Sequence, residues 1–156
     1  MSLTIRAYEP QDAAALARIF YHAVHVGTAN YYTVQQRRAW APQQPDAATW
    51  VRRLDGLITR VAVEGDAALG FMSARADGYL DLAFVDPNHA CRGVGRAVLA
   101  SLESEMRENG VALLTTEASL AARGFFLRRG WCDLAQQTVV KNGVSLSNWC
   151  MNKRLY

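Results

Sequence analysis

A nearly continuous apolar segment, residues 79–85, leads through a short glycine-containing loop into an amphipathic helical pattern. The segment is Tyr-Leu-Asp-Leu-Ala-Phe-Val and ends at Asp86-Pro87, which is typical of a strand covered on both faces. Apolar residues then recur every four positions across residues 93–108, which predicts a helix with one buried stripe. A buried strand that leads into such a helix is the repeating unit of α/β folds, so this passage places the chain in the α/β class.

The rest of the chain alternates strand and helix patterns around this unit. Strands are predicted at residues 3–7, 57–63, 68–73 and 112–117, and Asn142-Gly143 predicts a hairpin over 139–146. Helices are predicted from Pro10 past Val24, from Thr33 to Trp40, from Asp46 to Leu54 and from Ser119 to Arg129. The order predicts one domain over residues 1–156, with a mixed sheet of about seven strands flanked by helices.

Composition excludes several classes of protein. The 156 residues are 51% hydrophobic and 20% charged, as in globular domains, and the net charge of +3 favours an anionic ligand. The basic residues are scattered, so we expect no nucleic-acid partner, and no apolar run reaches the ~20 residues of a membrane span. Three cysteines without CxxC spacing, and no signal-peptide pattern, favour a cytoplasmic protein. His22 and His25 lack a third ligand, so no metal site is predicted.

The loop after residue 85 has the features of a phosphate site. The first-turn amides of a helix have no internal partners, and the helix dipole makes that end positive. Gly93 and Gly95 leave the backbone accessible to a ligand, while Arg92 and Arg96 add positive charge. We therefore predict a pyrophosphate site at residues 92–97. Two alternatives are a simple tight turn and a dinucleotide-binding loop, although the third glycine of the latter is missing.

Two motifs in register resemble those of the GNAT superfamily of N-acetyltransferases. Val85-Asp86-Pro87 and the segment 92–97 are similar to the strand end and acetyl-CoA loop of that family, with Ala90 where the family has Gln or Arg. The segment 119–131 is similar to the second motif, with Ser119 in place of Asn and Phe126 in place of Tyr.

The resemblance implies acetyl-CoA as co-substrate, held between two central parallel strands that splay apart. It assigns cofactor contacts to Phe84, Val85, Arg92, Gly93, Val94, Gly95, Arg96, Ala97, Ser119 and Phe126. The acetyl group would pass directly to a primary amine in a ternary complex. The family tyrosine protonates the departing thiolate, which Phe126 cannot do. An alternative is therefore a module that binds or senses acyl-CoA without catalysis.

The base and the acceptor pocket are less sharply indicated. Asp81 and Glu117 lie on or at the end of the predicted central strands, and either carboxylate can accept the proton of an amine. Each can instead form a structural ion pair or cap, and Asp81 is expected to share a face with Tyr79 and Ala83. The resemblance places the acceptor, a small molecule or a peptide amine, near Tyr31, Tyr32 and Trp40, which alternatively belong to the core. A monomer and a homodimer both remain open.

Overall fold

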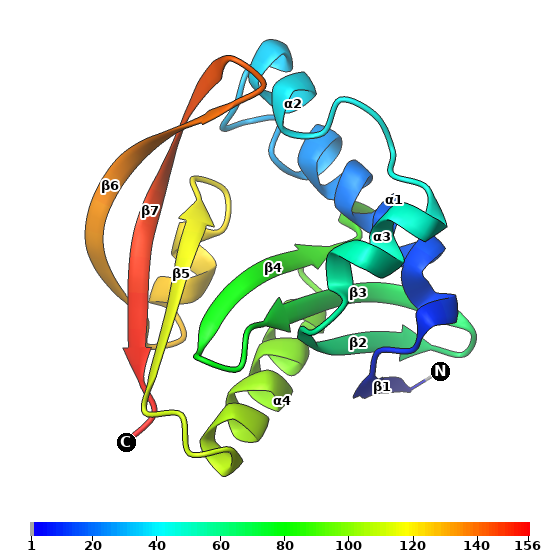
Figure 1. Ribbon diagram of the computed structural model, residues 1–156, viewed down its shortest axis with the longest axis vertical. Helices are drawn as coiled ribbons and strands as arrows, with labels where there is room; N and C mark the ends of the chain where they lie inside the picture. The colour runs from blue at the N-terminus through cyan, green and yellow to red at the C-terminus, as the bar shows by residue number, and fades with distance from the viewer. Residues whose placement is uncertain (1) are drawn as a thin grey trace.

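The computed structural model describes residues 2–156, which form a seven-stranded sheet in the order β1-β2-β3-β4-β5-β7-β6 (Figure 1). Only β4 and β5 pair in parallel, and the other neighbours are antiparallel. The predicted mixed sheet is confirmed. The strand bounds are β1 Leu3–Ala7, β2 Ile58–Glu64, β3 Ala67–Ala74, β4 Tyr79–Val85, β5 Leu113–Ser119, β6 Cys132–Lys141 and β7 Val144–Arg154.

Capping residues define the starts of two of the five helices. The Thr33 hydroxyl caps α2 by accepting Gln36 N–H at 3.1 Å, as predicted. The Asp46 carboxylate caps α3 by accepting Thr49 N–H at 2.7 Å, also as predicted. A 3₁₀ turn at Pro10–Asp12 precedes α1, and a π-helical turn at Ala23–Gly27 continues it. The helix bounds are α1 Ala13–His22, α2 Val34–Trp40, α3 Ala47–Leu54, α4 Val94–Glu108 and α5 Arg123–Leu127. None of the helices described is long and apolar enough to cross a membrane.

Two predicted boundaries were wrong. Ser119 is the last residue of β5 and not the first residue of a helix, because its carbonyl accepts Ala122 N–H at 3.1 Å in a turn that delays α5. The final hairpin runs from Cys132 to Arg154 and is far longer than residues 139–146. Most of β6 is exposed, so its residues lack the regular apolar alternation that marks a half-buried strand.

Helices cover both faces of the half-sheet β1–β4 (Figure 1). On one face, Val98, Leu102 and Met106 of α4 pack in a core cluster that contains Met72 of β3. On the other face, α1 and α3 pack in a second cluster around Phe71, the neighbour of Met72. Successive residues of β3 thus pack into the cores on opposite faces of the sheet, as in any strand buried on both faces.

A β-bulge at Asp81 separates β4 from β5. The two strands pair only at Tyr79–Thr115 and Leu80–Thr116, where the Thr116 hydroxyl donates to the Leu80 carbonyl at 2.8 Å. In the pairing with β3, Ser73 is opposite Leu82 and Ala74 is opposite Leu80, so Asp81 is the extra residue. A bulge bends its strand, and β4 diverges from β5 at this point (Figure 1).

The bulge also overturns the expectation that Asp81 shares a face with Ala83. Ala83 packs against the α4 cluster, whereas Asp81 pairs with Arg53 of α3 on the opposite face. The alternation of side chains is interrupted because the bulge inserts one residue into its period of two. We call the divergence of β4 and β5 beyond Leu80 and Thr116 the fork.

Candidate active site

Two cavities meet at the fork. The α3 cavity, of about 290 Å³, lies toward α3 and the β6–β7 hairpin. The α4 cavity, of about 400 Å³, lies toward the start of α4 and toward α5. Residues on the common wall line both cavities; they are Trp40, Ala83, Phe84, Ser119, Ala122 and Phe126. Two ligands can therefore approach one another through the gap between β4 and β5.

The first turn of α4 presents free amides to the α4 cavity. Gly93, the N-cap, adopts φ 80°, and no side chain caps this helix. Ala97 N–H bonds to the Gly93 carbonyl at 3.1 Å, so the amides of residues 94–96 precede the first intrahelical bond. The fifteen-residue helix adds the positive end of its dipole, which makes this end suited to an anion such as phosphate.

Two glycines permit the close packing that builds this cradle. A Cβ on Gly70 of β3 would lie 3.0 Å from Val94 Cγ1 and 3.1 Å from the Phe84 carbonyl. A Cβ on Gly95 would lie 3.1 Å from Cε1 of Phe125, the residue through which α5 contacts α4. The start of α4 is thus wedged between β3 and α5, directly at the end of β4.

Arginines around the α4 cavity have no opposing carboxylate among its lining residues. Arg96, Arg128 and Arg129 line the cavity, and the Nε atom of Arg129 is buried without a hydrogen-bond partner among residues 2–156. Arg92 and Ala97, predicted to contact the cofactor, do not line it. Arg92 instead donates to His89 Nδ1 at 2.6 Å and to Glu64 at 3.2 Å, which ties the loop to the end of β2. Sequence reasoning missed Arg128 and Arg129, whose position at the end of α5 was the available signal.

The backbone of β4 offers polar groups to the gap. Asp86 N–H donates to the Leu69 carbonyl of β3 at 2.8 Å. The alternation of an antiparallel ladder then turns the N–H and C=O of Ala83 and Val85 away from β3, toward the space that β5 has left. Val85 was predicted to make such contacts. Phe84 contributes its side chain to both cavities, while its backbone faces β3.

Aromatic side chains form much of the α3 cavity. Tyr32 and Trp40, predicted to contact the acceptor, both line it, and their rings meet edge to face at 5.7 Å. Tyr31 lines neither cavity, and 53% of its surface is exposed. The remaining aromatic lining residues are Phe20, Trp50, Tyr79, Phe84 and Phe126.

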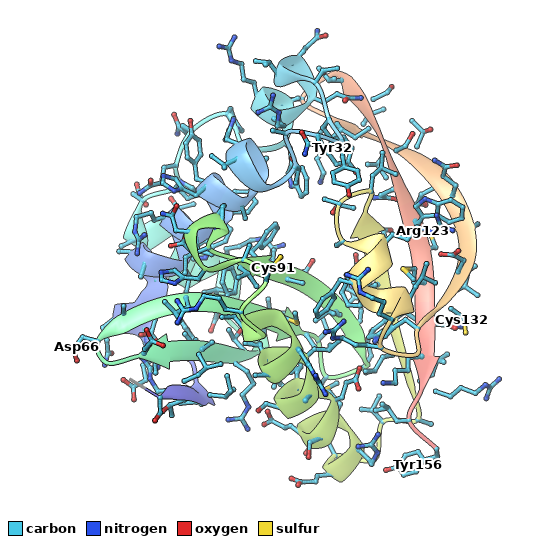
Figure 2. The ribbon with its side chains drawn as sticks, turned by 180° about the vertical axis from the view of Figure 1, so that it is seen from behind. Tyr32, Asp66, Cys91, Arg123, Cys132 and Tyr156 are labelled. Carbon is cyan, nitrogen blue, oxygen red and sulfur yellow. The ribbon has the colours of Figure 1, made fainter. Side chains whose placement is uncertain are left out.

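The hydroxyl of Tyr32 links three parts of the chain. It donates to the Ser147 carbonyl of β7 at 2.6 Å and accepts Leu120 N–H at 2.9 Å, between β5 and α5. Figure 2 shows Tyr32 projecting from the segment between α1 and α2 toward that turn. Burial raises the pKa of Tyr32, so its phenol stays neutral and keeps both hydrogen bonds. Both bonding capacities of the hydroxyl are thus used within the fold.

The two predicted catalytic carboxylates are brought together at the fork, directly after the last residues that pair β4 with β5. Asp81 accepts a hydrogen bond from Arg53 Nη1 at 2.7 Å. Glu117 is exposed and has no ion-pair partner among residues 2–156. Burial raises the pKa of the neighbouring Tyr79, and the charges of Glu117 and Asp81 raise it further. In the same described range, no three potential metal ligands are gathered.

Phe126 and Ser119 complete the common wall. Phe126 is 1% exposed and packs edge to face on Trp131 at 4.9 Å and on Phe125 at 5.3 Å. Its ring offers no proton to either cavity. The Ser119 hydroxyl oxygen accepts Ala122 N–H at 3.1 Å, which leaves its own proton available for donation.

Comparison with known proteins yields one family. A family model described as an acetyltransferase (GNAT) domain matches residues 28–154. The chain is similar to the uncharacterised N-acetyltransferase YafP of Escherichia coli (strain K12), at 36% identity over 150 residues that cover 96% of this chain and 95% of that protein. It is also similar to the solved structure of a GCN5-related N-acetyltransferase from Rhodopseudomonas palustris, with a TM-score of 0.92, 34% identity, and coverage of 99% and 96%.

A more distant structure carries a bound ligand. The PaiA N-acetyltransferase of Thermoplasma acidophilum, solved in complex with coenzyme A, matches with a TM-score of 0.77 and covers 99% of each chain. The two sequences are 14% identical, so this likeness shows a shared fold.

Proposed function

The chain belongs to the GNAT acetyltransferase family, and from this premise we propose that it transfers the acetyl group of acetyl-CoA to a primary amine. The family match confirms the resemblance to the GNAT superfamily. The observation that carries the proposal is the meeting of the two cavities at the fork, across a wall of six shared residues. A donor in one cavity and an acceptor in the other would react there within one ternary complex.

The residues of the α4 cavity fit acetyl-CoA. The amides of residues 94–96 suit its pyrophosphate, and Arg96, Arg128 and Arg129 supply positive charge near its phosphates. The backbone groups of Ala83 and Val85 suit the amides of the pantetheine arm, which would take the place of the β5 edge. The Thermoplasma protein of the same fold was solved with coenzyme A, which supports acetyl-CoA as the co-substrate.

Glu117 is the better candidate for the base. The amine nitrogen attacks the thioester carbonyl carbon, the C–N bond forms, the C–S bond breaks, and the nitrogen loses a proton. Glu117 faces the α3 cavity at the fork without an ion-pair partner in the described chain, so its carboxylate can receive that proton. Asp81 is held by Arg53, which favours a positioning role. The Ala83 amide would stabilise the developing oxyanion.

The leaving thiolate needs no strong acid. An unperturbed thiol has a pKa of about 8.5, so a thiolate departs readily near neutral pH. Phe126 gives no proton, while Ser119, on the same wall, can donate a hydrogen bond to the sulfur. Phe126 also favours a second candidate function, namely binding of acyl-CoA without turnover.

Release of free CoA from acetyl-CoA, measured against a panel of amines, amino acids and peptides, tests the proposal. Release that depends on an acceptor supports transfer. Tight binding of acetyl-CoA by calorimetry, with no release for any acceptor, would favour the binding module. Absence of binding would overturn the assignment of the α4 cavity.

A further inference from the structure

We infer that the acceptor is a small amine that carries an anionic group several bonds from its nitrogen, bound between Glu117 and Lys141 in the α3 cavity. This inference rests on the proposed function, because it assigns the reacting amine to the fork. The evidence is the closure of the cavity, the distribution of its charges and two buried polar atoms on its wall.

Hydrogen bonds close the α3 cavity on the side where α2 meets the final hairpin. Tyr32 donates to the Ser147 carbonyl at 2.6 Å, Gln36 donates to the Ser145 carbonyl at 3.1 Å, and Asn142 donates to the Ala39 carbonyl at 2.7 Å. These three bonds join α2 and the segment before it to the β6–β7 turn and to the first residues of β7. A polypeptide cannot pass through the cavity on this side, which favours a small acceptor.

Four charged side chains line this cavity, and two of them neutralise each other. Arg53 and Asp81 pair at 2.7 Å on one wall. Glu117 and Lys141 pair neither with each other nor with another charged residue in the part of the chain described. A cavity with one unpaired carboxylate and one unpaired ammonium is complementary to a ligand that carries both charges in the reverse order.

The strand register separates these two charges. Glu117 is opposite Cys150 of β7, and Lys141 is opposite Val144 of the same strand. Six residues of extended strand span about 20 Å, and Glu117 and Lys141 line the cavity from either end of that span. The distance left between the Glu117 carboxylate and the Lys141 ammonium is longer than the separation of the amine and carboxylate in an α-amino acid, where one carbon joins them. We therefore expect the two charges of the ligand to be several bonds apart.

Two buried polar atoms on the lining residues lack partners. Nε1 of Trp50 and Oδ1 of Asn148 are buried and make no hydrogen bond within the described structure. Asn148 lies on β7 between the positions opposite Glu117 and Lys141. A buried donor and a buried acceptor are costly unless something satisfies them. Each atom exposes less than 1 Å², so a shift of its side chain would bring it to a polar group of an acceptor molecule in the cavity.

The probes are ε-aminocaproate, its neutral amide ε-aminocaproamide, and alanine. We expect ε-aminocaproate to show a KM at least about tenfold below that of the amide, as a charge-assisted contact implies, and alanine to be poorer. Lys141→Gln should abolish the difference in KM between ε-aminocaproate and the amide, and Lys141→Glu should favour hexamethylenediamine. Arg38→Gln removes the same charge from the exposed surface of α2 outside both cavities, and should keep the wild-type preference.

Equal KM values for acid and amide, or a preference that survives in Lys141→Gln, would overturn the inference while leaving acetyl transfer intact. Calorimetric titration of the CoA-loaded protein with the same probes separates the two proposals when turnover is absent. Binding of ε-aminocaproate that is lost in Lys141→Gln would then support the inference and count against catalysis. Equal binding of acid and amide, or binding of neither, would overturn it.

Discussion

The guanidinium of Arg53 lies 2.7 Å from Oδ2 of Asp81, so one of the two carboxylates at the fork is held in an ion pair and the other is not. Asp81 is tied to α3, while Glu117 has no charged partner in the described chain. Replacing Glu117 by Gln should lower kcat by about 100-fold to 10 000-fold, the usual contribution of a general base. The affinity for acetyl-CoA should stay unchanged, because Glu117 does not line the α4 cavity. Rates of CoA release and calorimetry measure the two quantities.

Asp81→Asn serves as the matched control, since it removes a carboxylate from the same fork. Its partner Arg53 is partly exposed, and such pairs contribute about 0–1 kcal/mol to the free energy of unfolding. We expect urea unfolding to show this loss of stability in Asp81→Asn. Its rate of CoA release should be less than tenfold below that of the wild type. A larger rate loss in Asp81→Asn than in Glu117→Gln would reverse the two assignments.

Gly93→Ala should weaken acetyl-CoA binding as well as the fold. Gly93 has φ 80°, and alanine in that left-handed region costs roughly 1–2 kcal/mol. Gly56, between α3 and β2, has φ 77°, is equally open and lines neither cavity. Gly56→Ala should therefore lower the free energy of unfolding similarly but leave the Kd of acetyl-CoA unchanged. Equal Kd values for the two variants would argue against a ligand at this end of α4.

Tyr32→Phe should lower the free energy of unfolding by about 1–3 kcal/mol, because the Leu120 amide and the Ser147 carbonyl lose their partner. Tyr31→Phe, at an exposed neighbour, should change it by less than about 0.5 kcal/mol. Since burial raises the pKa of Tyr32 above 10.0, its contribution is complete below that pH and is lost as the pH rises through the folded-state pKa. The two variants should differ least at strongly alkaline pH, as denaturant titrations at several pH values would show.

The pair Arg6–Asp12 should govern part of the acid stability. The two hydrogen bonds from the Arg6 guanidinium to the Asp12 carboxylate each measure 2.8 Å. They are the main cause that lowers the pKa of Asp12 below 3.8, and the hydrogen bond from the Glu9 amide lowers it further. The stability contributed is therefore present above about pH 3.8 and is lost as the pH falls through the lower, folded-state pKa. Asp12→Asn should cost about 1–2 kcal/mol at neutral pH and progressively less below pH 3.8. Asp77→Asn, in an exposed pair at 3.4 Å, should have almost no effect at either pH.

The strand–loop–helix unit at residues 79–108 was predictable because its signals are local. Apolar runs, capping residues and glycines act within one or two turns of chain, and the same holds for Thr33 and Asp46. The bulge at Asp81 was not predictable, because the pairing with β3 decides it and Asp81 is flanked by leucines in an ordinary strand pattern. Arg92 illustrates the same limit: its partner Glu64 is 28 positions away, so the arginine seemed free for phosphate. The bond from Tyr32 to Ser147 spans 115 positions and leaves no trace in local sequence.

The two-residue pairing of β4 with β5 has a mechanical consequence. This pairing joins strands β1–β4 to strands β5–β7 at one end of the fork. At the opposite end, hydrogen bonds made by Tyr32, Gln36 and Asn142 join the α2 region to the final hairpin. The apolar core beneath α4 also joins the two halves of the sheet, whereas these hydrogen bonds border the α3 cavity and involve no residue of the first turn of α4. Substitutions of Tyr32, Gln36 or Asn142 are therefore expected to change the acceptor side of the molecule and to leave the start of α4 unchanged.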